Sequence, residues 1–177
     1  MKPKSFKFSL EYLKEALTYD SKTGEFTWNR RPPGHFRSSK SMNSCNTRWA
    51  GKRADSTTSD YATIFLCGEA WQAHRVAVFY VTGIPPVNEI DHINRKKKDN
   101  RFENLRECDR FTNLANCGLS VKNKSGAKGV HWNPDCRKWS AKLKFKNKSY
   151  YLGVFEKIDD AIEARKNAER IHYKQIP

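Results

Sequence analysis

The fold is decided between residues 89 and 116, which read EIDHINRKKKDNRFENLRECDRFTNLAN. A short strand is expected to end at Asp91-His92, and a basic loop follows it. Asn104-Leu105 then begins a returning strand, and Asp109 is a good N-cap for a short helix. An order of strand, loop, strand and helix brings the polar side chains of these elements together. We therefore expect four residues to lie close to one another: Asp91, His92, Asn104 and Asn113.

These residue types suit the hydrolysis of a phosphodiester. An imidazole titrates near neutral pH, so His92 is the candidate base that deprotonates the attacking water. A divalent cation on Asp91 and the amide oxygen of Asn113 would stabilise the charge on the phosphate and the leaving oxygen. Oxygen ligands favour Mg²⁺ or Mn²⁺ over Zn²⁺. Asn104 would orient either the His92 ring or the hairpin, and Asn116, one turn further on, is an alternative to Asn113.

The spacing of these four residues resembles the HNH nuclease family, in the ββα-metal form found in phage and intron homing endonucleases. Two preceding segments resemble the same family, namely His74-Arg75-Val76-Ala77 and Val81-Thr82-Gly83. The resemblance implies a single divalent ion on Asp91 and Asn113, with His92 as the base and Asn104 as the residue that positions it. The last position here is Asn113, where the family name has a histidine.

Before this motif, the sequence predicts an N-terminal region over residues 1–60 and a nuclease domain over residues 61–118. Apolar spacing predicts a helix within Phe6–Leu17, and a strand is expected over Glu25–Trp28. Residues 30–53 are rich in Ser, Asn, Gly, Pro and basic residues, so we expect a mobile loop that orders only on a nucleic-acid backbone. In the nuclease domain, a strand at Tyr61–Leu66 is followed by a strand-to-helix stretch that Gly83 ends as a C-cap.

After a linker at residues 119–126, residues 127–177 show a second pattern. Apolar and polar residues alternate from Trp139 to Lys146, which predicts a half-buried strand, and Asp159 is expected to cap a helix that runs to Tyr173. This module resembles the AP2/ERF-type DNA-binding domain through segments such as Ser125-Gly126-Ala127-Lys128-Gly129-Val130 and Tyr151-Leu152-Gly153-Val154-Phe155. The resemblance implies a three-stranded sheet that contacts DNA. The candidate contact residues are Lys128, Lys142, Lys144 and Tyr151.

The charge of the chain points to a polyanionic partner. Its formal net charge is +15, and residues 120–177 contain 14 Lys and Arg against 6 Asp and Glu, a net charge of +8. Basic residues around the motif are candidate phosphate contacts, although the run could also be a solvated loop: Arg95, Lys96, Lys97, Lys98, Arg101 and Arg106. His74 is either a packed histidine or a further phosphate contact.

Composition excludes other classes. No apolar run is long enough to cross a bilayer, and residues 1–7 lack the apolar stretch of a secretory signal. The five cysteines form no C-x-x-C pair, which favours free thiols in a reducing cytoplasm. We therefore expect an α+β protein that acts on double-stranded DNA as a metal-dependent endonuclease, as a monomer or a dimer, in a phage-infected cell. The alternative is a non-catalytic regulator that binds specific DNA sequences through its AP2-like domain.

Overall fold

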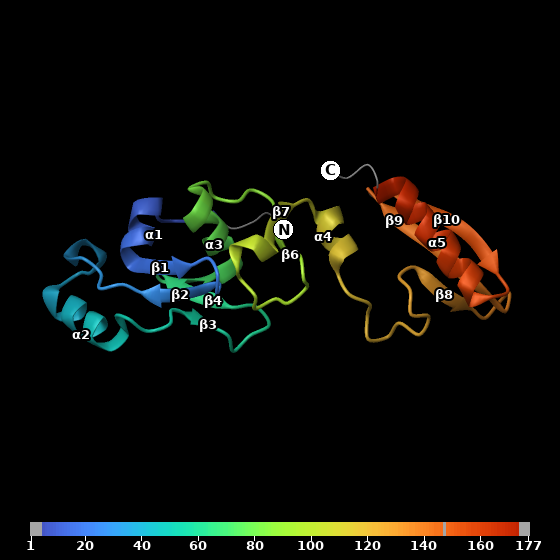
Figure 1. Ribbon diagram of the computed structural model, residues 1–177. Coiled ribbons are helices and arrows are strands. Elements are labelled where there is room, and N and C mark those ends of the chain that lie inside the picture. Colours follow the sequence, from blue (N-terminus) through green and yellow to red (C-terminus); the bar gives the residue numbers. More distant parts are fainter. Residues whose placement is uncertain (1–4, 147, 174–177) are drawn as a thin grey trace. The chain divides into compact units, whose positions relative to one another are not determined.

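The computed structural model describes residues 5–146 and 148–173 of the chain. It divides into two compact units between Asn116 and Cys117, called unit 1 and unit 2 below (Figure 1). The described part is a mixed α+β protein with five α-helices and four small antiparallel sheets. The α+β class that the sequence predicts is therefore confirmed.

The first part of unit 1 has three α-helices and a short 3-10 helix beside short strands. A capping bond starts the first helix, because the Ser9 hydroxyl accepts a hydrogen bond from the backbone N–H of Tyr12 at 3.2 Å. The elements in chain order are α1 (Leu10–Ala16), β1 (Leu17–Asp20), β2 (Glu25–Trp28), η1 (Pro33–His35), α2 (Ser39–Trp49), β3 (Asp55–Ser56), β4 (Thr63–Leu66), β5 (Glu69–Gln72) and α3 (Ala73–Thr82). Gly83 follows α3 with a φ of 72°, as the predicted C-cap requires.

One hydrophobic core runs through unit 1. Phe26 of β2 and Ile64 of β4 are both 0% exposed and belong to the same buried cluster as Ile90 and Leu105. Residues on both sides of position 60 therefore share this core and lie in the same compact unit. The N-terminal hairpin and the segment from residue 89 onwards form one folded body.

The expectation of a mobile loop over residues 30–53 is wrong. Most of this stretch forms η1 and α2, and Ser38 and Ser41 make a reciprocal capping box at the start of α2. The Asn46 side chain then ties the helix to the preceding chain, donating to the Arg31 carbonyl and accepting from the Arg31 N–H, each at 3.0 Å. Because polar side chains and not an apolar face stabilise α2, its sequence has no helical hydrophobic periodicity. The sequence pattern therefore predicted a loop.

The second part of unit 1 has the predicted order of strand, loop, strand and helix. Its elements are β6 (Glu89–His92), η2 (Phe102–Asn104), β7 (Leu105–Cys108) and α4 (Arg110–Asn116). β6 and β7 pair antiparallel, with Asp91 opposite Arg106 and His92 opposite Leu105. In Figure 1 these elements lie at one end of unit 1, and α2 lies at the other end.

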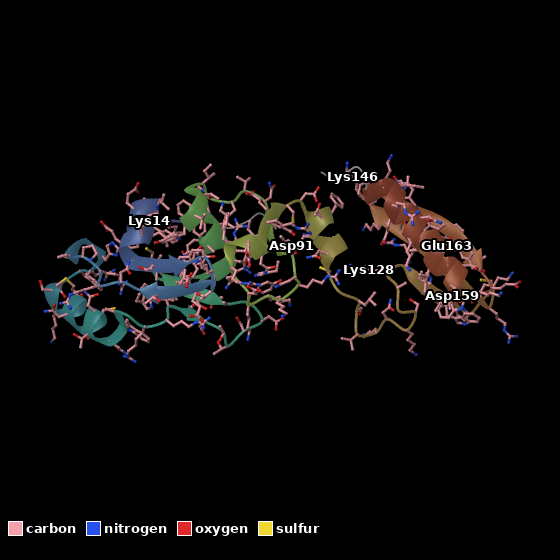
Figure 2. All side chains as sticks on the ribbon, in the orientation of Figure 1. Lys14, Asp91, Lys128, Lys146, Asp159 and Glu163 are labelled. Atoms are coloured by element: carbon pink, nitrogen blue, oxygen red, sulfur yellow. The ribbon has the colours of Figure 1, made fainter. Side chains whose placement is uncertain are left out.

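Unit 2 is a three-stranded antiparallel sheet with one helix, in the order β10–β9–β8. Its elements are β8 (Val130–Asn133), β9 (Lys138–Phe145), β10 (Lys148–Phe155) and α5 (Ile158–Tyr173). Ala141, Leu143 and Ala161 are fully buried, so α5 packs on the apolar face of the sheet. α5 begins at Ile158, and Asp159 therefore lies in its first turn and does not cap it. Figure 2 shows Asp159 and Glu163 along this helix.

Across the described ranges, no helix is both long enough and apolar enough to cross a bilayer.

Gly24 is the point where the β1–β2 hairpin meets the loop before η2. A Cβ on Gly24 would lie 2.5 Å from the backbone C of Asn100 and from the backbone N of Arg101. Gly51 has nearly the same φ, 77° against 78°, but a Cβ there would meet nothing within 4 Å. We expect Gly51→Ala to lower the free energy of unfolding by about 1 kcal/mol from the left-handed backbone alone. Gly24→Ala should lower the free energy of unfolding by clearly more, because the added methyl group would also separate the hairpin from the loop. Urea denaturation of both variants measures this, and equal losses would contradict the contact.

Candidate active site

Strand β6 brings Asp91 and His92 to the same edge of unit 1. Both are buried, with only 6% and 4% of their surface exposed. Figure 2 labels Asp91 on this strand, beside α4. Buried ionisable side chains need polar partners, so the residues around them define the site.

The Asp91 carboxylate has two partners in unit 1. Arg106, its neighbour across the β6–β7 pair, donates from Nε at 3.1 Å and from Nη2 at 2.8 Å to Asp91 Oδ2. Asn116 of α4 donates from Nδ2 to Oδ1 at 3.0 Å and to Oδ2 at 2.9 Å. The negative charge is thus balanced by one cation and by the positive end of one amide.

The Asn116 amide nitrogen lies among four oxygens. Besides both Asp91 oxygens, it donates to the backbone carbonyls of His92 at 2.9 Å and Ile93 at 3.5 Å. Such an oxygen cluster around a positive group is the donor chemistry of a hard divalent cation. Among the described residues there is no group of three or more His, Cys, Asp or Glu that could hold a metal. Any cation here would therefore depend on one carboxylate, amide oxygen, backbone carbonyls and water.

Asn113 does not contact Asp91. Its Nδ2 donates to Oε2 of Glu89 at 2.6 Å, one turn of α4 before Asn116. The sequence favoured Asn113 as the partner of Asp91 and kept Asn116 as the alternative. In the structure, Asn116 is the residue whose side chain meets the Asp91 carboxylate.

Asn104 acts on the loop between the strands. Its Oδ1 accepts from the backbone N–H of Asn94 at 3.0 Å, and its Nδ2 donates to the Asp99 carbonyl at 2.8 Å. These bonds close the base of the basic loop. Of the two roles expected for Asn104, the contacts correspond to orienting the hairpin, and no bond from Asn104 to the His92 ring is present in the described residues.

The His92 ring is held by residues that the sequence did not assign to the site. Its Nε2 lies 3.2 Å from Oδ1 of Asn100, which is 1% exposed. The His74 ring packs edge-on against it, with ring centroids 5.0 Å apart, and the Tyr61 ring centroid lies 6.1 Å away. Asn100 stands in a loop with no periodic signal, so only the folded hairpin reveals that it meets His92.

His74 is a packed histidine. It is 4% exposed, and burial, followed by the nearby charges of His92 and Arg75, lowers its pKa from 6.5 to about 3. A neutral ring has no positive charge with which to bind a phosphate. The alternative role of His74 as a phosphate contact therefore does not fit the structure.

The basic residues around the site differ in how free their charges are. Arg95 to Lys98 are all exposed, but Lys97 pairs with Asp60 at 2.9 Å and Lys98 donates to the Thr57 carbonyl at 2.6 Å. Arg95 Nε donates to Asn116 Oδ1 at 3.2 Å. Lys96 is exposed, and its backbone N–H donates to Asn94 Oδ1.

Arg101 and Arg106 are committed to carboxylates. Arg101 pairs with Asp99 and Glu103, each at 2.9 Å, and its hydrogen bonds are the largest reason why the pKa of Asp99 falls to about 2. Arg106 is bound to Asp91. In this structure both neutralise acids of the loop and site, and their expected contact with DNA stays a prediction.

In unit 2 the expected contact residues share one face of the sheet. Lys142, Lys144 and Tyr151 are exposed, and Tyr151 stands opposite Lys142 across the β9–β10 pair. Lys128 lies in the turn before β8, two residues before that strand begins, and Figure 2 labels it there. The face opposite α5 therefore has a row of basic and aromatic side chains.

Residues 72–115 match the family model of the HNH endonuclease. The match covers about a quarter of the chain, from the end of β5 through α3, β6 and β7 into α4. It includes all four residues that the sequence singled out and ends one residue before Asn116. Residues 72–115 are called the HNH segment below, and they support a nuclease that acts on DNA. No curated protein and no solved structure matches the chain.

The buried His74 ring predicts how the stability of unit 1 depends on pH. Its pKa is about 3 in the folded protein and about 6.5 when unfolded, so between these values only the unfolded chain binds the proton. The free energy of unfolding should therefore decrease as the pH falls from 6.5 towards 3, by up to about 1.4 kcal/mol per pH unit from this residue. Chemical denaturation at several pH values should show a shallower slope for His74→Gln. His131→Gln is the matched control on exposed β8 and should keep the wild-type slope; identical slopes for all three proteins would contradict the burial of His74.

Proposed function

We propose that the chain is a divalent-metal-dependent DNA endonuclease in which His92 is the general base. The observation that carries the proposal is the pairing, on one strand, of a buried imidazole with a carboxylate whose amide partner, Asn116, also meets backbone carbonyl oxygens. The HNH segment supports the nuclease class. General-base catalysis contributes a factor of about 10²–10⁴ to the rate, so the loss of His92 should reduce cleavage strongly.

The proposed cation is Mg²⁺ or Mn²⁺, held by Asp91 and an asparagine of α4. The contacts favour Asn116 for this role, since its amide already meets both oxygens of Asp91. Turning that amide would present its oxygen to the same place, and the orientation of an amide is an assignment made from its neighbours. A bound ion would polarise the phosphate and stabilise the leaving oxygen. Without a cation, Arg106 balances the charge of Asp91. A cation on Asp91 would therefore free Arg106 for the substrate phosphate.

Asn100 is the proposed positioning residue for His92. It contacts Nε2 of the ring at 3.2 Å and is itself fixed from behind, because the Tyr19 hydroxyl donates to its backbone carbonyl at 2.6 Å. A ring held through Nε2 leaves Nδ1 as the nitrogen that can accept a proton from water. This arrangement gives Asn100 the ring-orienting role, and Asn104 keeps the loop closed.

Unit 2 is the proposed DNA-binding module, and its likeness to the AP2/ERF type supports this role. Its strands expose Lys142 and Lys144 beside Tyr151, and residues 120–177 have a net charge of +8. Lysines bind phosphates as point charges and lack the forked geometry with which arginine reads guanine. The module should therefore hold the DNA backbone more than it reads sequence. Its resemblance to phage proteins is the basis for proposing a homing role.

The central test is cleavage of supercoiled plasmid by the wild-type protein and by His92→Ala, each with Mg²⁺ and with EDTA. We expect wild-type cleavage that needs the metal, with nicked circles as the main product if one chain acts alone. His92→Ala should lose at least about 100-fold in rate while still binding the plasmid. Gel shift and circular dichroism serve as the controls for binding and folding. A wild-type protein that binds the plasmid and leaves it intact with Mg²⁺ would instead indicate a regulator.

Asn116→Ala and Asn113→Ala form a matched pair on one helix. We expect Asn116→Ala to raise the Mg²⁺ concentration needed for half-maximal cleavage by about tenfold or more, because an oxygen ligand is lost. Asn113→Ala should leave this concentration nearly unchanged, since its side chain bonds Glu89 and not Asp91. Metal titrations of the cleavage rate decide between them. The reverse ranking would assign the metal to Asn113.

A further inference from the structure

A pocket lies in unit 1, formed by the N-terminal elements and not by the HNH segment. Its volume is about 600 Å³. It is lined by residues from α1, β2, η1, α2, β3 and β4, and five of them are aromatic: Tyr12, Trp28, Phe36, Trp49 and Phe65. In Figure 1, α2 and β6 stand at different ends of this unit, so the pocket and Asp91 are separate sites. We call it the aromatic pocket.

Two rings of the aromatic pocket are unusually open to solvent. Phe65 is 65% exposed and Trp49 is 41% exposed, although both neighbours of Phe65 on β4, Ile64 and Leu66, are buried. Large aromatic side chains exposed in a concave site are a feature of surfaces that stack flat ligands. These two rings are not buried in the core, so we attribute their exposed position to contact with a binding partner.

The chain segment that supplies much of the pocket lining is positively charged. Between Glu25 and Asp55 the sequence has seven Lys and Arg and no acidic residue. Arg31 extends over the rings of Trp28 and Phe36, 4.7 Å from each centroid, and its Nη2 donates to Cys45 Sγ at 2.7 Å. Arg31 has no carboxylate partner among residues 5–146 and 148–173, whereas Arg53 is paired with Asp55. The pocket thus offers aromatic faces beside an uncompensated guanidinium.

His35 adds an unused hydrogen-bonding group. Its side chain is 3% exposed, and its ring stacks on Tyr12 with centroids 3.8 Å apart. Nε2 meets Glu15 at 2.8 Å, but Nδ1 is buried and has no hydrogen-bond partner in the described structure. Buried polar atoms nearly always have partners, so an unpaired nitrogen in a pocket lining points to a polar ligand.

We propose that the aromatic pocket binds an unpaired nucleotide of a DNA strand. Flat rings beside cationic side chains are the recognition chemistry of single-stranded nucleic acid, in which bases stack and phosphates meet basic residues. The base would lie against Trp49 and Phe65, and the phosphates would lie along the basic stretch that includes Arg31. The polar edge of the base would supply a partner for His35. This inference relies on the proposed function only for DNA as the partner, and it does not depend on cleavage.

The test is fluorescence anisotropy of a labelled twelve-nucleotide oligothymidylate, measured in EDTA with the full chain. We expect Trp49→Ala and Phe65→Ala each to weaken binding by roughly tenfold, which is the size of a lost base-stacking contact. Trp49→Phe and Phe65→Tyr should retain most of the affinity because they keep a ring. Ile84→Ala is the matched control, since Ile84 is 69% exposed and lies outside the pocket.

A further arm locates the effect. Binding of a twelve-base-pair duplex should change little in the pocket variants. Wild-type affinity for the oligomer in both alanine variants would overturn the proposal. So would an equal loss for duplex and single strand, because it would indicate a general DNA surface and no site for an unpaired base. Plasmid cleavage is scored separately, so failure of the nuclease proposal would not be confused with failure of this one.

Discussion

The approach of the β1–β2 turn to the loop before η2 is the contact on which the rest of unit 1 depends. Gly24 lies where any side chain would strike the backbone of Asn100 and Arg101. Around it, the Tyr19 hydroxyl donates to the Asn100 carbonyl at 2.6 Å, and the Phe102 N–H donates to the Ser21 carbonyl at 3.3 Å. This backbone docking fixes Asn100, and Asn100 in turn meets the His92 ring. The N-terminal hairpin is thereby a structural part of the proposed nuclease site.

A second constraint is the buried charge of Asp91. A carboxylate that is 6% exposed needs compensation, and its partners come from two directions, Arg106 across the sheet and Asn116 from α4. The Asn116 bonds hold the last turn of α4 against β6, so the same contacts that neutralise the acid also place the helix. A divalent cation would replace positive groups that are already there. Exchange of this kind would let the site keep its charge balance both with a cation and without one.

The sequence predicted the parts of the fold that depend on local patterns. The strand at Glu25–Trp28, the end of α3 at Gly83 and the alternation in β9 all follow from neighbouring residues. The sequence also placed Asp91 and His92 together at the end of one strand, because they are adjacent. It did not identify Asn100, whose place depends on docking with Gly24, far away in the chain. It also misread α2, which is stabilised by Ser38 and Asn46 through hydrogen bonds and not by an apolar stripe.

The sequence pattern alone does not predict which of Asn113 and Asn116 contacts Asp91. The two residues stand three apart on a short helix, so both face β6, and a small rotation of α4 decides which one meets Asp91. That rotation is fixed by contacts at both ends of the β6 edge. Asn113 bonds Glu89 at the start of the strand, and Asn116 bonds Asp91 and the His92 carbonyl near its end. Glu89 therefore has a positional role, because it occupies Asn113 and leaves the carboxylate beside His92 to Asn116.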